Sequence, residues 1–164
     1  MSIEWLNAHA PGFAGLPAED REAIFEFSFL WSLFEARVLG GSACVRDIAA
    51  KVEEWQDAGA LAHDLYAGEL AYFRLRYFAH GAFTYHFDHL NLRKADAPDL
   101  VRAVLSGADD DPRNQVTTVL AIIWRFRNNL FHGAKWSYQL QGQLENFAHA
   151  NAVLMRVLER HGGL

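Results

Sequence analysis

The sequence predicts an all-α fold: an up-and-down bundle of four to five helices, with an irregular N-terminal arm and short extra helices. Apolar residues recur at spacings of three and four, the pattern of one buried helix face. One such stripe consists of Val45, Ile48, Ala49, Val52 and Trp55. No run alternates apolar and polar residues between turn signals, as a half-buried strand would. Three of the four prolines, Pro17, Pro98 and Pro112, stand where a helix can begin.

A single domain, residues 1–164, accounts for the whole chain. Hydrophobic residues make up 51% and aromatic residues 13%, which is enough to build one core of ordinary size. Cys44 stands alone, so it has no partner for an intramolecular disulfide, and no leader-like segment opens the chain. We therefore expect a cytoplasmic protein. The longest apolar stretch, residues 24–39, is interrupted by Glu26, Glu35 and Arg37, which indicates a buried helix and no membrane span.

The charge of the chain is unevenly distributed. The net charge is −5, the wrong sign for a protein that coats nucleic acid with its whole surface. Basic residues nevertheless gather at Arg125, Arg127 and Lys135. The acidic excess lies elsewhere, in residues 19–26, 53–57 and 109–111. Any contact with RNA is therefore expected to be local.

The first half of the chain divides into an arm and three helices. Residues 1–16 show little periodicity and are predicted to be an irregular arm, laid over the bundle by Trp5 and Phe13. The first helix is predicted over residues 17–39 and ends at Gly40, because glycine readily adopts the left-handed conformation that closes a helix. A second helix is predicted from after Ser42 to near Gly59, and a third over residues 60–79.

The second half contains two strongly marked helices. Residues 81–92 are rich in aromatic side chains, and periodicity does not decide whether they form a short helix or extend the preceding one. Asp96 is predicted to cap a short helix over 97–105, and Asp111 with Pro112 to open a long helix over 113–131. Gly133 is predicted to close that helix, and the last helix covers residues 143–160.

Residues 127–132, Arg-Asn-Asn-Leu-Phe-His, combine side chains that suit RNA cleavage without a metal. His132 is predicted in the last turn of its helix, and an imidazole with an ordinary pKa of about 6.5 can take or give a proton near neutral pH. Arg127 can stabilise the negative charge that develops on phosphorus when a ribose 2′-hydroxyl attacks it. Asn128 and Asn129 offer amide donors and acceptors that could orient the imidazole or a phosphate oxygen.

This segment resembles the R-N-x-x-x-H signature of the HEPN superfamily, and with Gly133 and Lys135 it looks like the Apea-type branch. The aromatic segment 29–37, which contains Glu35, is similar to the first helix of that family. The resemblance implies a helical bundle whose homodimer brings two copies of Arg127, Asn128 and His132 around one cleft, with no metal or other cofactor.

The resemblance also implies a class of activity and partners. The family includes ribonuclease toxins, phage-defence effectors and RNA-processing enzymes, and also inactive members that bind a partner protein or nucleotide. We therefore expect a metal-independent endoribonuclease acting on RNA, with a non-catalytic interaction module as the alternative. A nucleotidyltransferase antitoxin or a larger defence protein is a further expected partner. One branch carries a tyrosine that such an antitoxin modifies, but the corresponding residue here is Ala134.

Helix geometry and family pattern disagree about which arginine is functional. At 100° per residue, Arg125, Asn128, Asn129 and His132 fall on one helix face, whereas Arg127 points with the apolar residues. A buried Arg127 would need a carboxylate such as Glu35. The family pattern favours Arg127 as catalytic; Arg125, Asn129, Lys135 and Glu35 are then predicted to support it or bind phosphate.

Two other groups of side chains are open to functional interpretations. His86 and His89 lie three residues apart and, with His80 and Asp88, suggest a metal site, but their aromatic neighbours favour packing. Arg74 and Arg76 alternate with aromatic residues and suggest an RNA groove, although a solvated helix face is the ordinary explanation. The stripe formed by Phe25, Phe29, Trp31 and Phe34 is predicted to be core or dimer surface.

Overall fold

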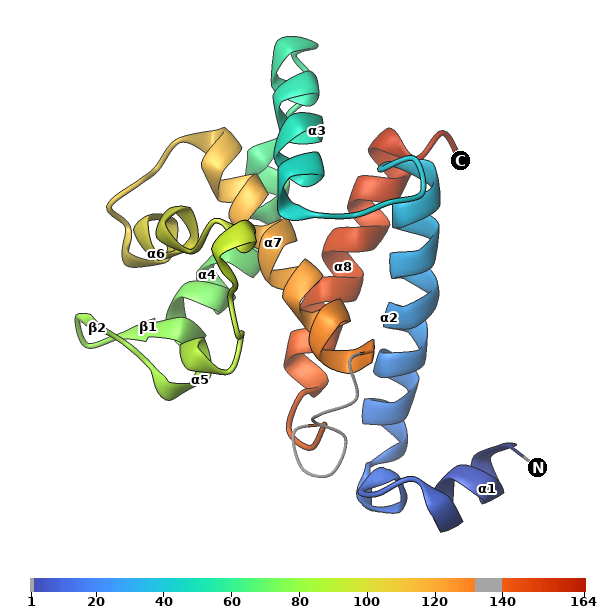
Figure 1. Ribbon diagram of the computed structural model, residues 1–164. Helices are drawn as coiled ribbons and strands as arrows, with labels where there is room; N and C mark the ends of the chain where they lie inside the picture. The colour runs from blue at the N-terminus through green and yellow to red at the C-terminus, as the bar shows by residue number, and fades with distance from the viewer. Residues whose placement is uncertain (1, 132–139) are drawn as a thin grey trace.

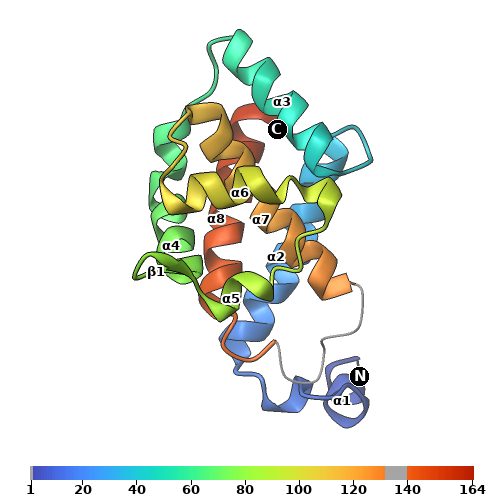
Figure 2. The same cartoon turned by 60° about the vertical axis from the view of Figure 1, so that its left-hand side comes forward.

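The computed structural model, which describes residues 2–131 and 140–164, is an all-α bundle (Figures 1 and 2). Its three longest helices are α2 (Ala18–Arg37), α7 (Pro112–Phe131) and α8 (Leu144–His161). α2 packs along α8, while α7 packs against α3 (Val45–Asp57) and α6 (Pro98–Ser106). The predicted fold class is therefore confirmed.

Helices α2, α3, α6, α7 and α8 lie within a few residues of their predicted bounds. Gly40 and Gly41 follow α2 with φ of 75° and 100°, which is the left-handed conformation predicted there. Asp111 accepts hydrogen bonds from the backbone N–H groups of Arg113 (2.9 Å) and Asn114 (3.4 Å), as expected of the residue that opens α7.

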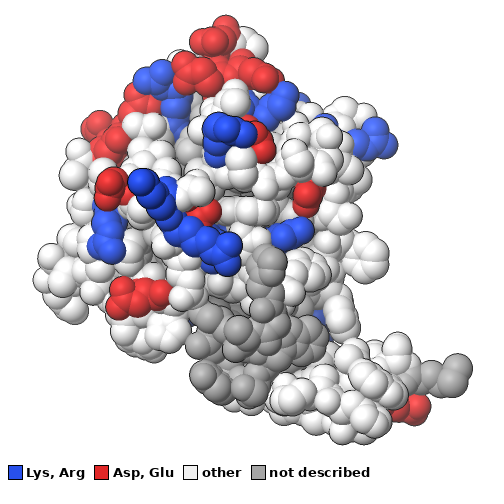
Figure 3. All heavy atoms as spheres, viewed as in Figure 1, with Lys and Arg blue, Asp and Glu red and all other residues white. Residues whose placement is uncertain are grey.

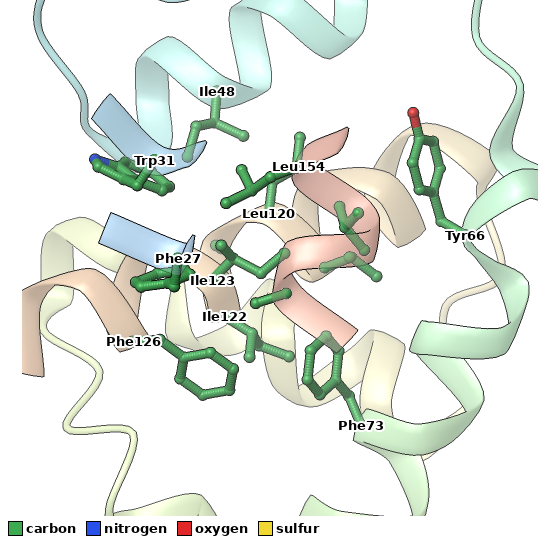
Figure 4. Close-up of a cluster of buried hydrophobic side chains, with 14 of the residues drawn as sticks. Phe27, Trp31, Ile48, Tyr66, Phe73, Leu120, Ile122, Ile123, Phe126 and Leu154 are labelled. Atoms are coloured by element: carbon green, nitrogen blue, oxygen red, sulfur yellow. The ribbon is translucent and has the colours of Figure 1, made fainter. Parts of the chain in front are cut away.

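The core lies where α2, α7 and α8 meet. Figure 4 shows Phe27, Ile122, Ile123 and Phe126 converging there from two of these helices. The ring of Phe27 lies 5.1 Å from that of Phe147, and Trp31 lies 5.7 Å from Trp124. Burying each such side chain contributes roughly 1.5–3 kcal/mol to the free energy of unfolding. Of the stripe predicted on α2, Trp31 and Phe34 are core, while Phe25 and Phe29 are exposed.

The predicted irregular N-terminal arm is wrong in part, because its first half is the helix α1 (Ser2–His9). A 3₁₀ turn η1 (Phe13–Gly15) follows it. Phe13 is buried and anchors the arm as expected, but Trp5 stays 59% exposed and stacks on His9 at 4.6 Å. This local contact between residues four apart stabilises a short helix whose apolar periodicity is too weak to predict it.

The predicted helix over 60–79 begins later than expected. Residues 58–62 form a loop, η2 (His63–Tyr66) is a 3₁₀ turn, and the regular helix α4 is Ala67–Tyr77. The expectation of no strand is wrong at one place, because β1 (Phe78–Ala79) pairs with β2 (Ala82–Phe83). His80 and Gly81 have φ of 53° and 77°, the two positive values that a tight hairpin turn requires.

The open segment 81–92 thus contains β2 and the single-turn helix α5 (Tyr85–Asp88). The prediction that Asp96 caps the next helix is wrong: the residue before α6 is Ala97, and Asp96 ends a 3₁₀ turn, η3 (Lys94–Asp96). Asp96 is buried instead, where its Oδ2 accepts the Arg93 backbone N–H at 2.8 Å and lies 3.0 Å from Nη1 of Arg125 in α7.

In the part of the chain that the structure describes, no helix combines the length and apolar character needed to cross a membrane.

Candidate functional site at the end of helix α7

Arg125 is a buried structural arginine. Its side chain is 3% exposed, and its Nη1 lies 3.0 Å from Asp96 Oδ2, whose side chain is 7% exposed. Its Nε donates to the Leu90 carbonyl at 3.0 Å. Burial lowers the pKa of Arg125, and the charge of Asp96 acts in the opposite direction. The arginine therefore fixes the segment 90–96 against α7, a position that does not suit the phosphate-binding role expected for it.

Asn129 reinforces the same junction. Its Nδ2 donates to the carbonyls of His89 (3.2 Å) and Leu90 (3.3 Å), and its Oδ1 accepts a hydrogen bond from Arg125 Nη2 at 3.4 Å. Both ends of the amide are thus engaged within the protein. Asn129 therefore holds the backbone of His89 and Leu90 against α7.

Arg127 is placed very differently from Arg125. It is half-buried at the edge of the core, with its guanidinium carbon 5.4 Å from the ring centres of both Trp124 and Phe131. Its Nη1 donates to Oδ1 of the buried Asn128 at 3.2 Å, and its Nε has no hydrogen-bond partner among the described residues. No carboxylate in residues 2–131 or 140–164 forms an ion pair with it, and residues 132–139 contain no Asp or Glu.

Glu35 does not neutralise Arg127 in the described structure. Its Oε2 instead accepts the indole N–H of Trp31, one turn earlier in α2, at 2.9 Å. A buried arginine needs a carboxylate partner, and in this structure the buried arginine is Arg125, which pairs with Asp96. Arg127 remains a cation stacked between aromatic rings, an arrangement that is favourable when the guanidinium is only partly desolvated.

His132 and Lys135 lie outside the described residues, as do the predicted Gly133 helix end and the loop containing Trp136 and Tyr138. The sequence places His132 directly after Phe131, the last residue of α7.

A cavity of about 390 Å³ opens beside the described part of the motif. Asn129 and Leu130 of α7 form one wall, and Arg76, Tyr77, Tyr85, His86 and residues 140–143 contribute others. Arg74, by contrast, donates from Nε to the Val104 carbonyl at 3.0 Å, and Phe73 is fully buried. Of the basic and aromatic residues considered for an RNA groove on α4, only Arg76 and Tyr77 line this cavity.

Several residues of this region were not identified from the sequence. The sequence around Asp96 predicts a helix cap. Its actual partner, Arg125, lies 29 residues later in the chain, and no local pattern indicates that contact. Tyr85 belongs to the aromatic segment 81–92, in which periodicity does not decide the structure, and His86 is suggested there only as a metal ligand. The one available signal was the excess of aromatic residues and histidines in that segment.

No group of three or more His, Cys, Asp or Glu side chains is arranged to hold a metal ion in the described ranges. In the segment 80–89 that was considered for a metal, Tyr85 packs against both His86 and His89. Its ring lies 4.0 Å from that of His86 and 5.7 Å from that of His89.

Comparisons with protein-family models, with curated proteins and with solved structures found no match to this chain.

Proposed function

We propose that this protein is a HEPN-type endoribonuclease that cleaves RNA without a metal, with Arg127, Asn128 and His132 as catalytic residues. The observation that supports it most is the contrast between two arginines two positions apart. Arg125 is buried and neutralised by Asp96, whereas Arg127 is half-buried without a carboxylate. A partly exposed guanidinium that no carboxylate neutralises can bind an anionic phosphate.

The reaction uses the proton chemistry of the imidazole. One His132 takes the proton of a ribose 2′-hydroxyl, O2′ attacks the adjacent phosphorus, and the bond from phosphorus to O5′ breaks. The leaving O5′ receives a proton from an imidazolium, supplied by His132 of a second copy. Arg127 stabilises the charge on the phosphorane oxygens, and Asn128 holds Arg127 through its Oδ1. The products are a 2′,3′-cyclic phosphate and a 5′-hydroxyl.

Exposed cations close to the motif support contact with an RNA backbone. Arg93 and Lys94 are exposed, and Arg93 lies near enough to Arg125 to lower its pKa. Figure 3 shows Lys and Arg side chains across the middle of one face, with acidic side chains among them and near its top. A chain with net charge −5 can bind phosphates at such a local group.

The proposal includes a homodimer, because the reaction needs both a base and an acid and each copy has one His132. It also places the protein in the cytoplasm. Phe131, which is 55% exposed next to Arg127, offers apolar surface at the end of α7 for the second copy. Regulation by a nucleotidyltransferase antitoxin or a larger defence protein remains part of the proposal, as does Lys135 as a phosphate contact.

Cleavage assays on single-stranded RNA test this function. We expect His132→Ala and Arg127→Ala each to reduce the rate at least about 100-fold, the usual contribution of a general acid–base group. Arg46→Ala is the matched control, since its side chain on α3 is 90% exposed. A wild-type dimer that cuts no RNA at high concentration, or a His132→Ala variant of normal rate, would refute the proposal.

A non-catalytic interaction module is the second candidate, favoured by an exposed apolar surface. Phe25, Phe29 and Leu30 of α2 line a groove together with Ile3 and Met155, and Phe29 is 79% exposed. If this is the functional surface, Phe29→Ser abolishes a partner complex while His132→Ala has no effect on it. Under the ribonuclease proposal, Phe29→Ser retains RNA cleavage by the isolated protein.

A further inference from the structure

The cavity beside α7 combines a positive charge with aromatic walls. None of its described lining residues is acidic, although acidic residues outnumber basic ones in the chain by 20 to 15. Arg76 supplies a cation there, and its Nε is buried without a hydrogen-bond partner among the described residues. Burial, this charge and His89 lower the pKa of His86 from its ordinary value, which favours the neutral imidazole.

The rim of the cavity carries an aromatic pair, Tyr85 and His86, whose rings pack against each other. Tyr85 is 68% exposed, and its ring lies 4.0 Å from that of His86 at an angle of 34°. The hairpin β1–β2 holds this pair in place, since Thr84 Oγ1 donates to the Arg76 carbonyl at 2.7 Å and Thr84 N–H to the Tyr77 carbonyl at 2.9 Å. An exposed tyrosine beside a neutral histidine is a typical stacking surface for a nucleobase.

The deeper wall of the cavity is polar and already organised. Asn146 Nδ2 donates to Gln143 Oε1 at 2.5 Å, and Asn146 Oδ1 accepts the Tyr72 hydroxyl at 2.9 Å. Asn129, held by the His89 and Leu90 carbonyls, forms the side that faces the motif. These hydrogen bonds hold the Asn146 and Asn129 side chains in place on the described walls of the cavity.

We infer that this cavity binds one unpaired nucleobase of the RNA next to the cleaved phosphate, and so makes the enzyme specific for single-stranded RNA. This inference rests on the proposed function. A volume of about 390 Å³ falls within the usual range for small-ligand pockets and suits one base with part of its ribose. The base stacks on the free face of the exposed Tyr85 ring, and the Arg76 guanidinium donates to a carbonyl oxygen at its edge.

The proposed preference for single-stranded RNA depends on where the cavity lies relative to residues 127–132. Asn129 and Leu130 belong both to the cavity wall and to the segment between Arg127 and His132. A base held there lies against the end of α7; Arg127 itself does not line the cavity, so the phosphate has to extend along this helix end to reach it. A paired base cannot enter such a pocket without leaving its stack, so duplex RNA is a poor substrate.

Binding of a non-cleavable oligonucleotide tests this inference separately from catalysis. The probe is a short, fluorescent single strand of 2′-O-methyl RNA, whose blocked 2′-oxygen prevents cleavage. We expect Tyr85→Ala and Arg76→Gln each to weaken its binding at least about tenfold, the lower range for losing one stacked base. Tyr85 is exposed, so its removal leaves the core intact even if Arg76→Gln impairs folding.

Two control variants match these changes. Leu75→Ala removes a side chain that is 78% exposed on the same helix α4, and Arg46→Gln removes a cation of equal charge on α3. Both should bind the probe as the wild type does. A probe of the same length with abasic sites should bind as weakly as Tyr85→Ala does to the intact probe.

Two results would overturn the inference: equal binding of intact and abasic probes, or unchanged binding by Tyr85→Ala. Tyr85-dependent binding by a protein that cleaves no RNA would support the base pocket and refute the ribonuclease. Cleavage of single-stranded and duplex RNA at equal rates would refute the pocket and leave the ribonuclease standing.

Discussion

Replacing Arg125 and Arg127 separately by methionine should have opposite consequences for stability and activity. Arg125→Met leaves the Asp96 carboxylate, 7% exposed, without its charged partner and the Leu90 carbonyl without the Nε donor. Removing one member of a buried pair costs about 3–5 kcal/mol of the free energy of unfolding. For a domain of 164 residues, this corresponds to roughly 6–20 °C in Tm.

Arg127→Met should change stability by less than about 1 kcal/mol, because two small effects offset each other. The variant loses the hydrogen bond to Asn128 Oδ1 but also removes a buried Nε that has no partner in the described structure. The methionine side chain retains contact with Trp124 and Phe131. RNA cleavage should nevertheless fall at least about 100-fold.

Urea unfolding followed by tryptophan fluorescence measures the free energy for both variants, and a cleavage assay measures the rate. The reasoning is refuted if Arg127→Met is destabilised as strongly as Arg125→Met, since Arg127 would then be a structural residue. It is equally refuted if Arg125→Met unfolds at the wild-type urea concentration.

Further predictions concern pH, metal and the core. Burial and the charge of Arg160 lower the pKa of His161 from 6.5, so the unfolded chain binds this proton more readily than the folded one. The free energy of unfolding should therefore decline as pH falls below about 6.5, and His161→Gln should flatten that decline in urea titrations at pH 7.5 and 5.5; an unchanged slope would contradict the assignment. EDTA should leave the RNA cleavage rate unchanged, and a loss that magnesium restores would argue for a metal enzyme. Phe27→Ala, at a fully buried site, should cost about 3–5 kcal/mol in urea unfolding, whereas Phe29→Ala should stay within about 0.5 kcal/mol; equal losses would contradict the assignment of the core.

The long helices were predictable because their signals are local. Pro17 and the glycines after residue 39 delimit α2, and Asp111 with Pro112 marks the start of α7. These signals depend on the backbone conformation of a few consecutive residues. The structure of residues 78–92 depends on a positive φ at His80, which a histidine adopts only in a suitable context.

The sequence predicted which residues, 127–132, form the candidate site, but not how their side chains and neighbours are arranged in space. The helix wheel placed Arg125 on the polar face and Arg127 toward the core, whereas the structure buries Arg125 and leaves Arg127 half-buried at the edge of the core. The wheel could not show that Asp96 reaches Arg125, because that contact depends on how the chain between residues 90 and 96 crosses α7. The cavity likewise needs residues from α4, α5, α7 and the start of α8 to meet.

The most direct measurement is to identify the products of a single cut in an RNA whose cleaved position carries either a ribose or a 2′-deoxyribose. Mass spectrometry should find a 2′,3′-cyclic phosphate and a 5′-hydroxyl from the all-ribose strand, and no cut at the deoxy position. A cut at the deoxy position, or a product ending in a 3′-hydroxyl, would contradict attack by the 2′-oxygen and with it the roles of Arg127 and His132.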